Sequence, residues 1–379
     1  MKRPTVCAYY FPNWHVDPRN EKLHGKGWTE WRVVQHATPR FEGHIQPVVP
    51  LWGYQDESDP KVMEQKIGAA VSNGIDAFIF DYYWFADGPY RERCLLEGFF
   101  PAKNCRDIKF ALMWANHDPI YAHPGSYLNP RESLWSGDID PETFLTCTDH
   151  LIETCFCRPN YLRVDGKLYF SLFNPRKLIV QLGGKRTAKL LFDDLRRRIE
   201  RANLGELNLD AILYGLGKTD SMDEINSLIR EVGFDSASNY SNLRGEGFPS
   251  FEYDVMTDLN DIEMRRISRE LCVPYHPVVT TGFDNSPRTV QSDMFENIGY
   301  PFSAVAINNT PEAWERCLHL AKAFTDSTEF TGSLLHLSCW NEWTEGSYLE
   351  PDTRYGYGYL QAIKNTFGTE KTSRKERSE

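Results

Sequence analysis

Residues 334–346 read LLHLSCWNEWTEG, and this stretch decides how the chain is interpreted. The apolar run from Leu334 to Cys339 stops abruptly at polar and aromatic residues, which predicts a buried strand that delivers side chains to a site. Glu342 and Glu345 follow, three residues apart among indoles. Two carboxylates this close do not ionise equally once water is excluded, so one would act as an acid and the other as a base. The alternative is that both are solvated loop charges and the tryptophans belong to the core.

Apolar, β-rich runs recur along the chain with helical stretches between most of them, the pattern of parallel βα units. Eight such strands can be counted, which predicts an α/β fold, a single (β/α)₈ TIM barrel. A doubly wound open sheet is the main rival, but no G-x-G-x-x-G follows the first strand. The predicted strands are Thr5–Tyr10, Ala77–Tyr82, Lys109–Trp114, Leu168–Phe173, Ala211–Tyr214, Asp235–Asn239, Pro277–Thr281 and Leu334–Cys339. The predicted helices are Pro60–Asn73, Pro141–Glu153, Thr187–Ala202, Ser221–Glu231, Asp254–Leu271 and Pro311–Thr325.

The segment Pro12–Asp59 is too long for an ordinary βα loop. Its tryptophans and histidines favour a large loop between the first strand and the first helix, lying over the barrel mouth, rather than a disordered insertion. The sequence therefore predicts one catalytic barrel domain over residues 1–368. Residues 369–379, dense in lysine, arginine, glutamate and serine, are predicted to form a disordered charged tail.

Functional side chains of a barrel lie where its strands end, at the carboxyl face. Nearly every predicted strand here ends in hydrogen-bonding or aromatic residues, although a capping or turn role is the simpler explanation for any single one. Indoles beside paired carboxylates suit a sugar pocket, because a flat apolar face can stack on a pyranose ring. The candidate substrate-binding residues at these ends are Tyr10, Trp14, Asp81, Tyr82, Trp84, Asn116, His117, Tyr240, Asp284, Arg288, Trp340 and Trp343.

Composition narrows the class of protein. A formal net charge of -11 argues against a nucleic-acid partner, for which a basic stripe is the expected footprint. No run approaches the roughly 18 consecutive apolar residues of a membrane helix, so membrane insertion is not expected. Histidine pairs at H-x-H or H-E-x-x-H spacing are absent, so neither a metal nor another cofactor is expected.

Cysteine usage and the first residues bear on the compartment. The nine cysteines are an odd number, and Cys7, Cys272 and Cys339 fall in or beside apolar runs, which favours reduced, buried thiols. Met1-Lys2-Arg3-Pro4 leads straight into the first predicted strand without a signal peptide. A cytoplasmic protein is expected, or a periplasmic or secreted one if a leader has been removed.

Five motifs fall in one order along the chain: Trp28-Thr29-Glu30-Trp31, Gly43-His44-Ile45-Gln46-Pro47, Tyr82-Tyr83-Trp84-Phe85, Trp114-Ala115-Asn116, and W-N-E-W-x-E-G with the following Glu350-Pro351. Together they resemble glycoside hydrolase family 99-like proteins, also called the WbsX-type domain and often encoded in polysaccharide gene clusters. The resemblance covers about residues 5 to 365 and adds Glu350 to the candidate binding residues. It implies a metal-free, retaining glycoside hydrolase acting on α-linked glycans, mannan-like or a cell-surface polysaccharide.

The resemblance also implies roles for the two glutamates. In family 99 the first carboxylate takes the proton of the substrate's own 2-hydroxyl, giving a 1,2-anhydro sugar. The second protonates the leaving oxygen and then activates water. These roles fall on Glu342 and Glu345. An ordinary retaining enzyme holds its carboxylates on opposite sides of the scissile centre, whereas residues three apart tend to approach from one side. His117 stands where many relatives carry glutamate, and Asp81 adds another carboxylate, so the sugar is left open.

Other classes of protein remain possible. The first is a sugar-transferring enzyme of polysaccharide or O-antigen biosynthesis on the same barrel. No glycine-rich phosphate loop is present, and Asp138-Ile139-Asp140 precedes a predicted helix, so these aspartates are interpreted as its cap. The second is a glycan-binding barrel without catalysis, which would be expected to have lost one of the two glutamates.

Overall fold

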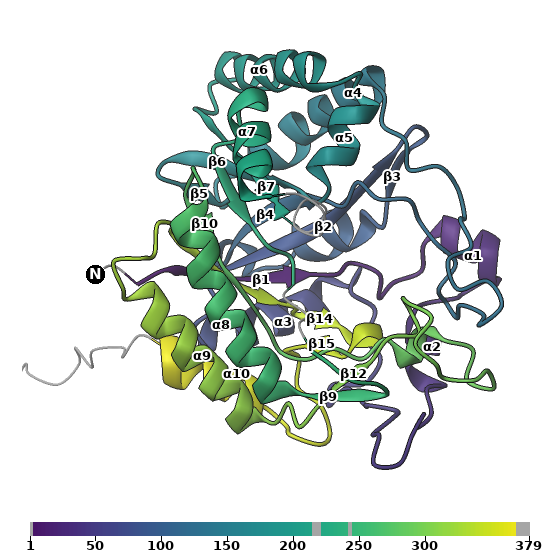
Figure 1. The fold of residues 1–379 in the computed structure, drawn as a ribbon. Helices are drawn as coiled ribbons and strands as arrows, with labels where there is room; N and C mark the ends of the chain where they lie inside the picture. The colour runs from purple at the N-terminus through teal and green to yellow at the C-terminus, as the bar shows by residue number, and fades with distance from the viewer. Residues whose placement is uncertain (1–2, 214–220, 242–244, 369–379) are drawn as a thin grey trace, which may run out of the picture.

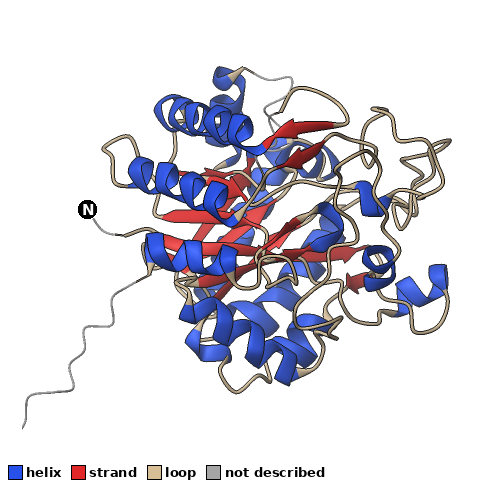
Figure 2. Ribbon diagram, turned by 90° about the horizontal axis from the view of Figure 1, so that it is seen from below, coloured by secondary structure: helices blue, strands red, loops and turns tan. Residues whose placement is uncertain are grey.

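Eight parallel strand positions alternate with helices along the chain and form a barrel with the helices outside it (Figures 1 and 2). The computed structural model describes residues 3–213, 221–241 and 245–368. The predicted charged tail, residues 369–379, lies outside them. The barrel strands are β1 (Thr5–Tyr10), β2 (Ala77–Phe85), β4 (Lys109–Trp114), β6 (Lys167–Leu172), β7 (Leu207–Ile212), β8 (Ser236–Ser238), the pair β10 (Tyr275–His276) and β11 (Val278–Thr280), and β13 (Leu334–Ser338).

The barrel closes at its seventh strand, which Pro277 divides in two. β10 pairs with β8 on one side, β11 pairs with β13 on the other, and only Pro277 separates them. Proline has no N–H to donate, so it interrupts the ladder where the strand changes partners. Its carbonyl accepts the backbone N–H of His336 at 2.9 Å. Because β1 pairs with both β13 and β2, the ring is complete, and the predicted TIM barrel is confirmed.

Helices cover the outside of the barrel, and several start where the sequence predicts. Asp59 and Thr310 cap helices that begin with proline, and Asp140 accepts the backbone N–H of Thr143 at 2.7 Å, as expected of a cap. None of the described helices has both the length and the apolar character needed to cross a membrane. The outer helices are α3 (Pro60–Ser72), α4 (Pro141–Leu151), α5 (Pro175–Gln181), α6 (Lys185–Arg201), α7 (Met222–Val232), α8 (Tyr253–Glu270), α9 (Pro311–Thr325) and α10 (Gly358–Phe367).

The barrel strands are buried on both faces, as parallel strands between a filled interior and a helical layer must be. Most match their predicted ranges closely, but β7 starts earlier than the predicted Ala211, and Tyr214 lies outside the described residues. The prediction missed the first half of β7 because its Asp210 is polar. This carboxylate is buried in the barrel, where it accepts the hydroxyls of Ser236 at 2.7 Å and Ser238 at 2.5 Å.

The segment Pro12–Asp59 lies over the barrel mouth, as predicted, and carries two short helices, α1 (Pro18–His24) and α2 (Trp31–Gln35). In Figure 1 both lie on the opposite side of the molecule from the N-terminus. Short strand pairs extend the loops around the same end. They are β3 (Gly88–Tyr90) on the end of β2, β9 (Ser250–Glu252) with β12 (Val305–Ile307), and β14 (Asn341–Glu342) with β15 (Ser347–Tyr348). A further short strand, β5 (Arg163–Val164), pairs with the start of β6.

Candidate active site

A small hairpin after β13 presents both candidate catalytic glutamates. Glu342 ends β14, a 3-10 turn spans Trp343–Glu345, and the chain returns in β15. The turn closes at Gly346, whose φ of 62° is left-handed and whose added Cβ would lie 2.7 Å from the Cβ of Asp284. Glycine is therefore required both by the backbone conformation and by the space. This geometry directs Glu342 and Glu345 into one cavity of about 410 Å³.

Six of the predicted site residues line that cavity together, and the others do not. The side chains come from the ends of β2, β4, β8 and β11 and from the hairpin after β13. Strand ends from around the barrel therefore converge on one space, as barrel architecture predicts. The six residues are Asp81, His117, Tyr240, Arg288, Glu342 and Glu345.

Arg288 holds the two glutamates in place. Its Nη1 donates to Glu345 Oε1 at 2.8 Å, and its Nη2 lies 3.4 Å from Glu342 Oε1. The hydroxyl of Tyr300 also donates to Glu345 Oε1 at 2.9 Å. Both contacts fall on one oxygen, so Oε2 of Glu345 has no hydrogen-bond partner among the described residues. That oxygen is available to carry a proton toward a ligand.

Glu30, from the Trp28–Trp31 motif of the long loop, supports Arg288 from behind. This fully buried carboxylate accepts the Thr344 hydroxyl at 2.5 Å and lies 3.2 Å from Arg288 Nη2. It also accepts the side-chain amide of Asn13 and lies 3.3 Å from His123 Nε2. Burial alone would raise the pKa of Glu30, but His123 and Arg288 hold it below its ordinary value. Glu30 is therefore an ionised anchor of the site.

Glu342 lies in a different electrostatic environment. It is 5% exposed, and burial, followed by the charge of Glu345, raises its pKa to about 8. Tyr240 Oη lies 2.9 Å from Glu342 Oε2 and 3.0 Å from Asp81 Oδ2. Because one hydroxyl hydrogen serves only one acceptor, the second contact requires a protonated carboxyl. Burial and the charge of Glu342 raise the pKa of Asp81 as well. A proton on either Asp81 or Glu342 therefore allows Tyr240 to contact both carboxyl groups.

The expectation that Tyr82 and Trp84 line the cavity is wrong. Successive side chains of a strand point to opposite faces, so residues next to Asp81 cannot share its direction. Tyr82 points outward and donates to Glu92 at 3.0 Å, and the Trp84 ring packs 5.0 Å from that of His150. The inward residues after Asp81 are Tyr83 and Phe85, and both line the cavity.

The same alternation explains why Asn116 and Tyr10, which were predicted from the sequence to lie at the site, do not line the cavity. Met113, Ala115 and His117 line the cavity, whereas Asn116 is buried beneath it, its amide donating to the Asn174 carbonyl at 2.8 Å. Tyr10 points outward from β1, and its hydroxyl lies 2.9 Å from Glu57.

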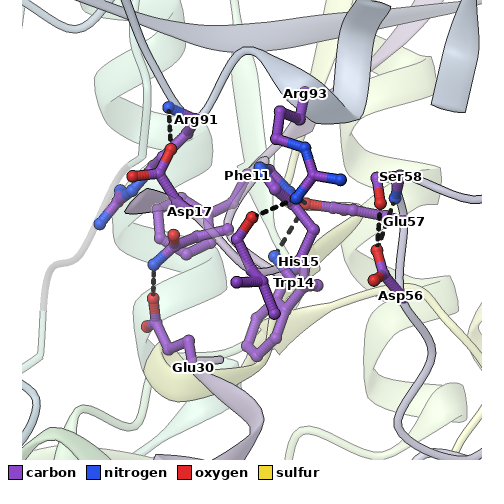
Figure 3. A network of polar contacts seen from close by, with 12 residues as sticks. Phe11, Trp14, His15, Asp17, Glu30, Asp56, Glu57, Ser58, Arg91 and Arg93 are labelled. Carbon is purple, nitrogen blue, oxygen red and sulfur yellow. Dashed lines mark hydrogen bonds and ion pairs between the residues drawn. The ribbon is translucent and has the colours of Figure 1, made fainter. Parts of the chain in front are cut away.

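Trp14 is also buried rather than lining the cavity. Its ring centroid lies 4.0 Å from that of Trp31. Its backbone N–H donates to Glu57 at 2.8 Å (Figure 3). Trp14 and its neighbour His15, whose Nδ1 lies 3.3 Å from Glu57 in the same network, attach the loop after β1 to the barrel.

Trp340, Trp343 and Glu350 form one support behind the hairpin that carries Glu342 and Glu345, and none of them lines the cavity. Both indole N–H groups donate to Glu350, at 2.9 Å from Trp340 and 2.8 Å from Trp343. Lys66 lies 2.8 Å from the same carboxylate and balances its charge. Trp340 is 0% exposed. These indoles therefore fix the position of the hairpin and are unavailable for stacking on a sugar.

Asp284 lies outside the cavity as well, on the wall of a neighbouring cavity of about 490 Å³. Its carboxylate accepts the Gln46 amide at 2.6 Å and lies 2.8 Å from His44 Nε2. His44 Nδ1 accepts the backbone N–H of Arg40, so Nε2 carries the hydrogen. The Asp284 backbone N–H in turn donates to the Glu345 carbonyl at 2.5 Å. The Gly43–Pro47 motif thus reaches the catalytic hairpin through Asp284.

We expect His44→Ala to lower kcat on any substrate of this site by up to about 100-fold, with little change in KM. The reason is that Asp284, which holds the Glu345 carbonyl, loses a partner, and misplacement by about 1 Å can cost that much. Steady-state kinetics with a thermal melt measures both effects. His36→Ala, in the same loop but exposed, is the matched control. An unchanged kcat in His44→Ala would contradict the positioning role.

The sequence interpretation missed the aromatic wall of the cavity. Only Tyr240 was predicted among its aromatic rings. Alternation from Asp81 could have identified Tyr83 and Phe85, but the remaining rings come from the short strand β3 and from loops with no periodic signal. The missed aromatic residues are Phe11, Tyr83, Phe85, Tyr90, Phe173, Phe283 and Tyr300.

The fold and the site together define a (β/α)₈ barrel with paired carboxylates at the carboxyl end of its last strand. The chain belongs to the WbsX glycosyltransferase family, because the model described as "Glycosyltransferase WbsX" matches residues 6–363. It is similar to the protein WxcX of Xanthomonas campestris pv. campestris in two strains, B100 and ATCC 33913, with 26% identity over 377 residues in each case. The match covers 95% of this chain and 49% of those proteins, so the chain spans about half the length of these curated relatives.

Solved structures support the fold. A GH99 endo-alpha-mannosidase from Bacteroides thetaiotaomicron aligns with a TM-score of 0.56 and 14% identity, over 95% of this chain and 96% of that one. Its complex with bis-tris propane aligns with a TM-score of 0.60 and 13% identity, over 96% of each chain. A "glycoside hydrolase-like protein" aligns with a TM-score of 0.60 and 16% identity, over 97% and 95%. At these identities the likeness establishes the barrel fold alone.

Proposed function

We propose that the protein is a retaining glycoside hydrolase that acts on α-linked glycans with Glu342 and Glu345 as its catalytic pair. The observation that carries the proposal is that both carboxylates leave one hairpin turn and are held by the same guanidinium at the wall of one cavity. Two carboxylates that approach from one side suit a hydroxyl and the adjacent glycosidic oxygen. They suit in-line attack on the anomeric carbon poorly.

In the proposed reaction Glu342 removes the proton of the sugar 2-hydroxyl while Glu345 protonates the leaving oxygen. The 2-oxygen closes on the anomeric carbon, giving a 1,2-anhydro sugar, and the glycosidic bond breaks. Glu345 then takes a proton from water, which opens the anhydro ring with net retention, and Glu342 returns its proton to the 2-oxygen. The raised pKa of Glu342 makes it a strong base once ionised. Oε2 of Glu345 is available to hold the proton that the leaving oxygen needs.

The direct experiment is incubation of the purified protein with α-linked manno-oligosaccharides and bacterial cell-surface polysaccharides, followed by analysis of the products. New reducing ends of retained configuration support the proposal. The family description names a glycosyltransferase, and this is the second candidate. Parallel reactions that contain a nucleotide sugar separate the two, because elongation that depends on the nucleotide sugar would overturn hydrolysis.

The pH dependence should differ between two kinds of substrate. The glutamate pair is active with one proton, so kcat/KM on a natural oligosaccharide should fall as that proton leaves at a pH of about 8. An activated aryl glycoside needs no acid, only an ionised Glu342. Its kcat/KM should therefore rise with pH, about tenfold per unit below 8, and level off above it. Initial rates between pH 5 and 9.5 measure both profiles. If the aryl glycoside showed no rising limb, Glu342 would not be the base.

A further inference from the structure

Arg91 occupies an unusual place in the wall of the catalytic cavity. It follows β3 with a left-handed φ of 62°, and its backbone N–H donates to Asp17 at 3.1 Å (Figure 3). The residue is 8% exposed. Its guanidinium carbon lies 5.0 Å, 4.8 Å and 4.5 Å from the ring centres of Phe11, Tyr83 and Tyr90. Three aromatic rings that line the cavity thus surround one buried cation.

The charge of Glu30 acts on this cation from a distance, but no anion among the described residues contacts it directly. Arg91 forms no ion pair with any described carboxylate, and its Nε is buried without a hydrogen-bond partner. Arg288, equally buried, contacts Glu30, Glu342 and Glu345. A buried charge is costly unless it is paired, and ring contacts of about 0.5–2 kcal/mol offset only part of that cost. A site that holds an unpaired guanidinium is therefore complementary to an anionic ligand.

The position of Arg91 indicates where the anionic group of that ligand would lie relative to Glu342 and Glu345. Phe11 lies between the two arginines, with the Arg288 guanidinium carbon 5.5 Å and that of Arg91 5.0 Å from its ring centre. An anionic group at Arg91 would therefore belong to the sugar held at the glutamates or to its neighbour. Arg131, exposed on the wall of the same cavity, adds a second positive charge that pairs with no described carboxylate.

We propose that the substrate is an acidic glycan and that Arg91, with Arg131, binds an anionic substituent of a sugar residue beside the cleaved bond. The substituent is a uronic-acid carboxylate or a sulfate ester, both of which match the planar fork of a guanidinium. This inference rests on the proposed function, because it names the substrate class of the same cavity. It makes Arg91 a specificity residue with no part in the proton transfers.

Binding to the full chain carrying Glu345→Gln tests the inference without turnover. The probes are α-linked oligogalacturonate and its carboxyl-reduced counterpart, and sulfated fucan oligosaccharides and their desulfated counterparts, measured by calorimetry. We expect one acidic glycan to bind at least about 10-fold more tightly than its neutral partner. Adding Arg91→Gln should remove that preference, and Arg91→Lys should retain part of it. If oligogalacturonate shows the tighter binding, the substituent is a carboxylate; if the sulfated fucan oligosaccharide shows it, the substituent is a sulfate ester.

Arg19→Gln is the matched control, because Arg19 packs over Phe85 and Tyr90 but pairs with Asp87 outside the cavity. It should keep the preference for the acidic glycan. If no acidic glycan binds more tightly than its neutral partner, or if Arg91→Gln folds normally and keeps the preference, the inference is overturned. Binding that depends on Arg91 without hydrolysis by the wild-type chain would instead refute the proposed function and leave the inference standing.

Discussion

Replacing Glu345 with glutamine should slow cleavage of a natural oligosaccharide by about 10²–10⁴-fold, while an activated aryl glycoside loses far less. Only the natural leaving oxygen needs the proton that Glu345 supplies. Glu342→Gln should be severe on both substrates, because the neighbouring hydroxyl must be deprotonated whatever the leaving group. Measuring kcat/KM for the two variants on the two substrates gives the four numbers that assign the roles.

A substrate without its 2-hydroxyl gives an independent control, because it cannot form an anhydro sugar and should not turn over. Hydrolysis of that 2-deoxy glycoside at a normal rate would contradict the proposed route and indicate a carboxylate nucleophile. Asp81 and Asp118 would then be the residues to replace, because both line the cavity. Asp284 would not be, since it is committed to His44 and Gln46.

Arg288→Met should lower the free energy of unfolding by about 3–5 kcal/mol at pH 7 and reduce activity by at least about 100-fold. The substitution leaves the buried Glu30 and Glu342 and the half-buried Glu345 without their shared cation. Glu30 has a lowered pKa in the wild-type chain, so its stabilising contribution is present above the unfolded pKa of the carboxyl and is lost as the pH falls. The difference in stability between wild type and variant should therefore stay constant from pH 7 down to about pH 5 and shrink as the pH falls below about 4. Urea titrations at several pH values measure it.

A double variant, Glu30→Gln with Arg288→Met, should recover part of the lost stability, because one uncompensated charge is gone. Arg316→Met is the matched control. Arg316 also pairs with two carboxylates, Asp254 and Asp258, but at the surface, so its loss should cost less than about 1 kcal/mol. An equal cost for the buried and exposed arginines would refute the account of Arg288 as the clamp of the site.

The sequence was sufficient for the barrel because most of its buried strands are largely apolar runs between helical stretches. β1, β4 and α9 match their predicted ranges residue for residue. The hairpin that carries Glu342 and Glu345 could be located too, since both residues follow the last such run directly. The directions of the side chains at the strand ends were less predictable. Tyr82 and Asn116 were chosen for chemistry alone, although the period of two excludes them once Asp81 and His117 face inward.

The roles of Trp340, Trp343 and Arg91 could not be predicted for another reason. Whether an indole faces a ligand or a carboxylate depends on residues distant in sequence, here Glu350 and Lys66. No sequence motif marks Arg91, because what distinguishes it is that it forms no ion pair with any described carboxylate in the folded structure. Such absences are visible only after the neighbouring residues have been placed.

The closure of the barrel by β1 against β13 has a consequence for how the protein must be made. The backbone N–H of Phe11 donates to the Asn341 side chain, and Thr344 donates to Glu30, over sequence separations of 330 and 314 residues. Loop-closure entropy on this scale slows folding, and no early fragment contains both halves of the site. A nascent chain therefore lacks the site until its final βα unit has been synthesised. A polypeptide cut between the two halves should regain activity only when the pieces reassociate.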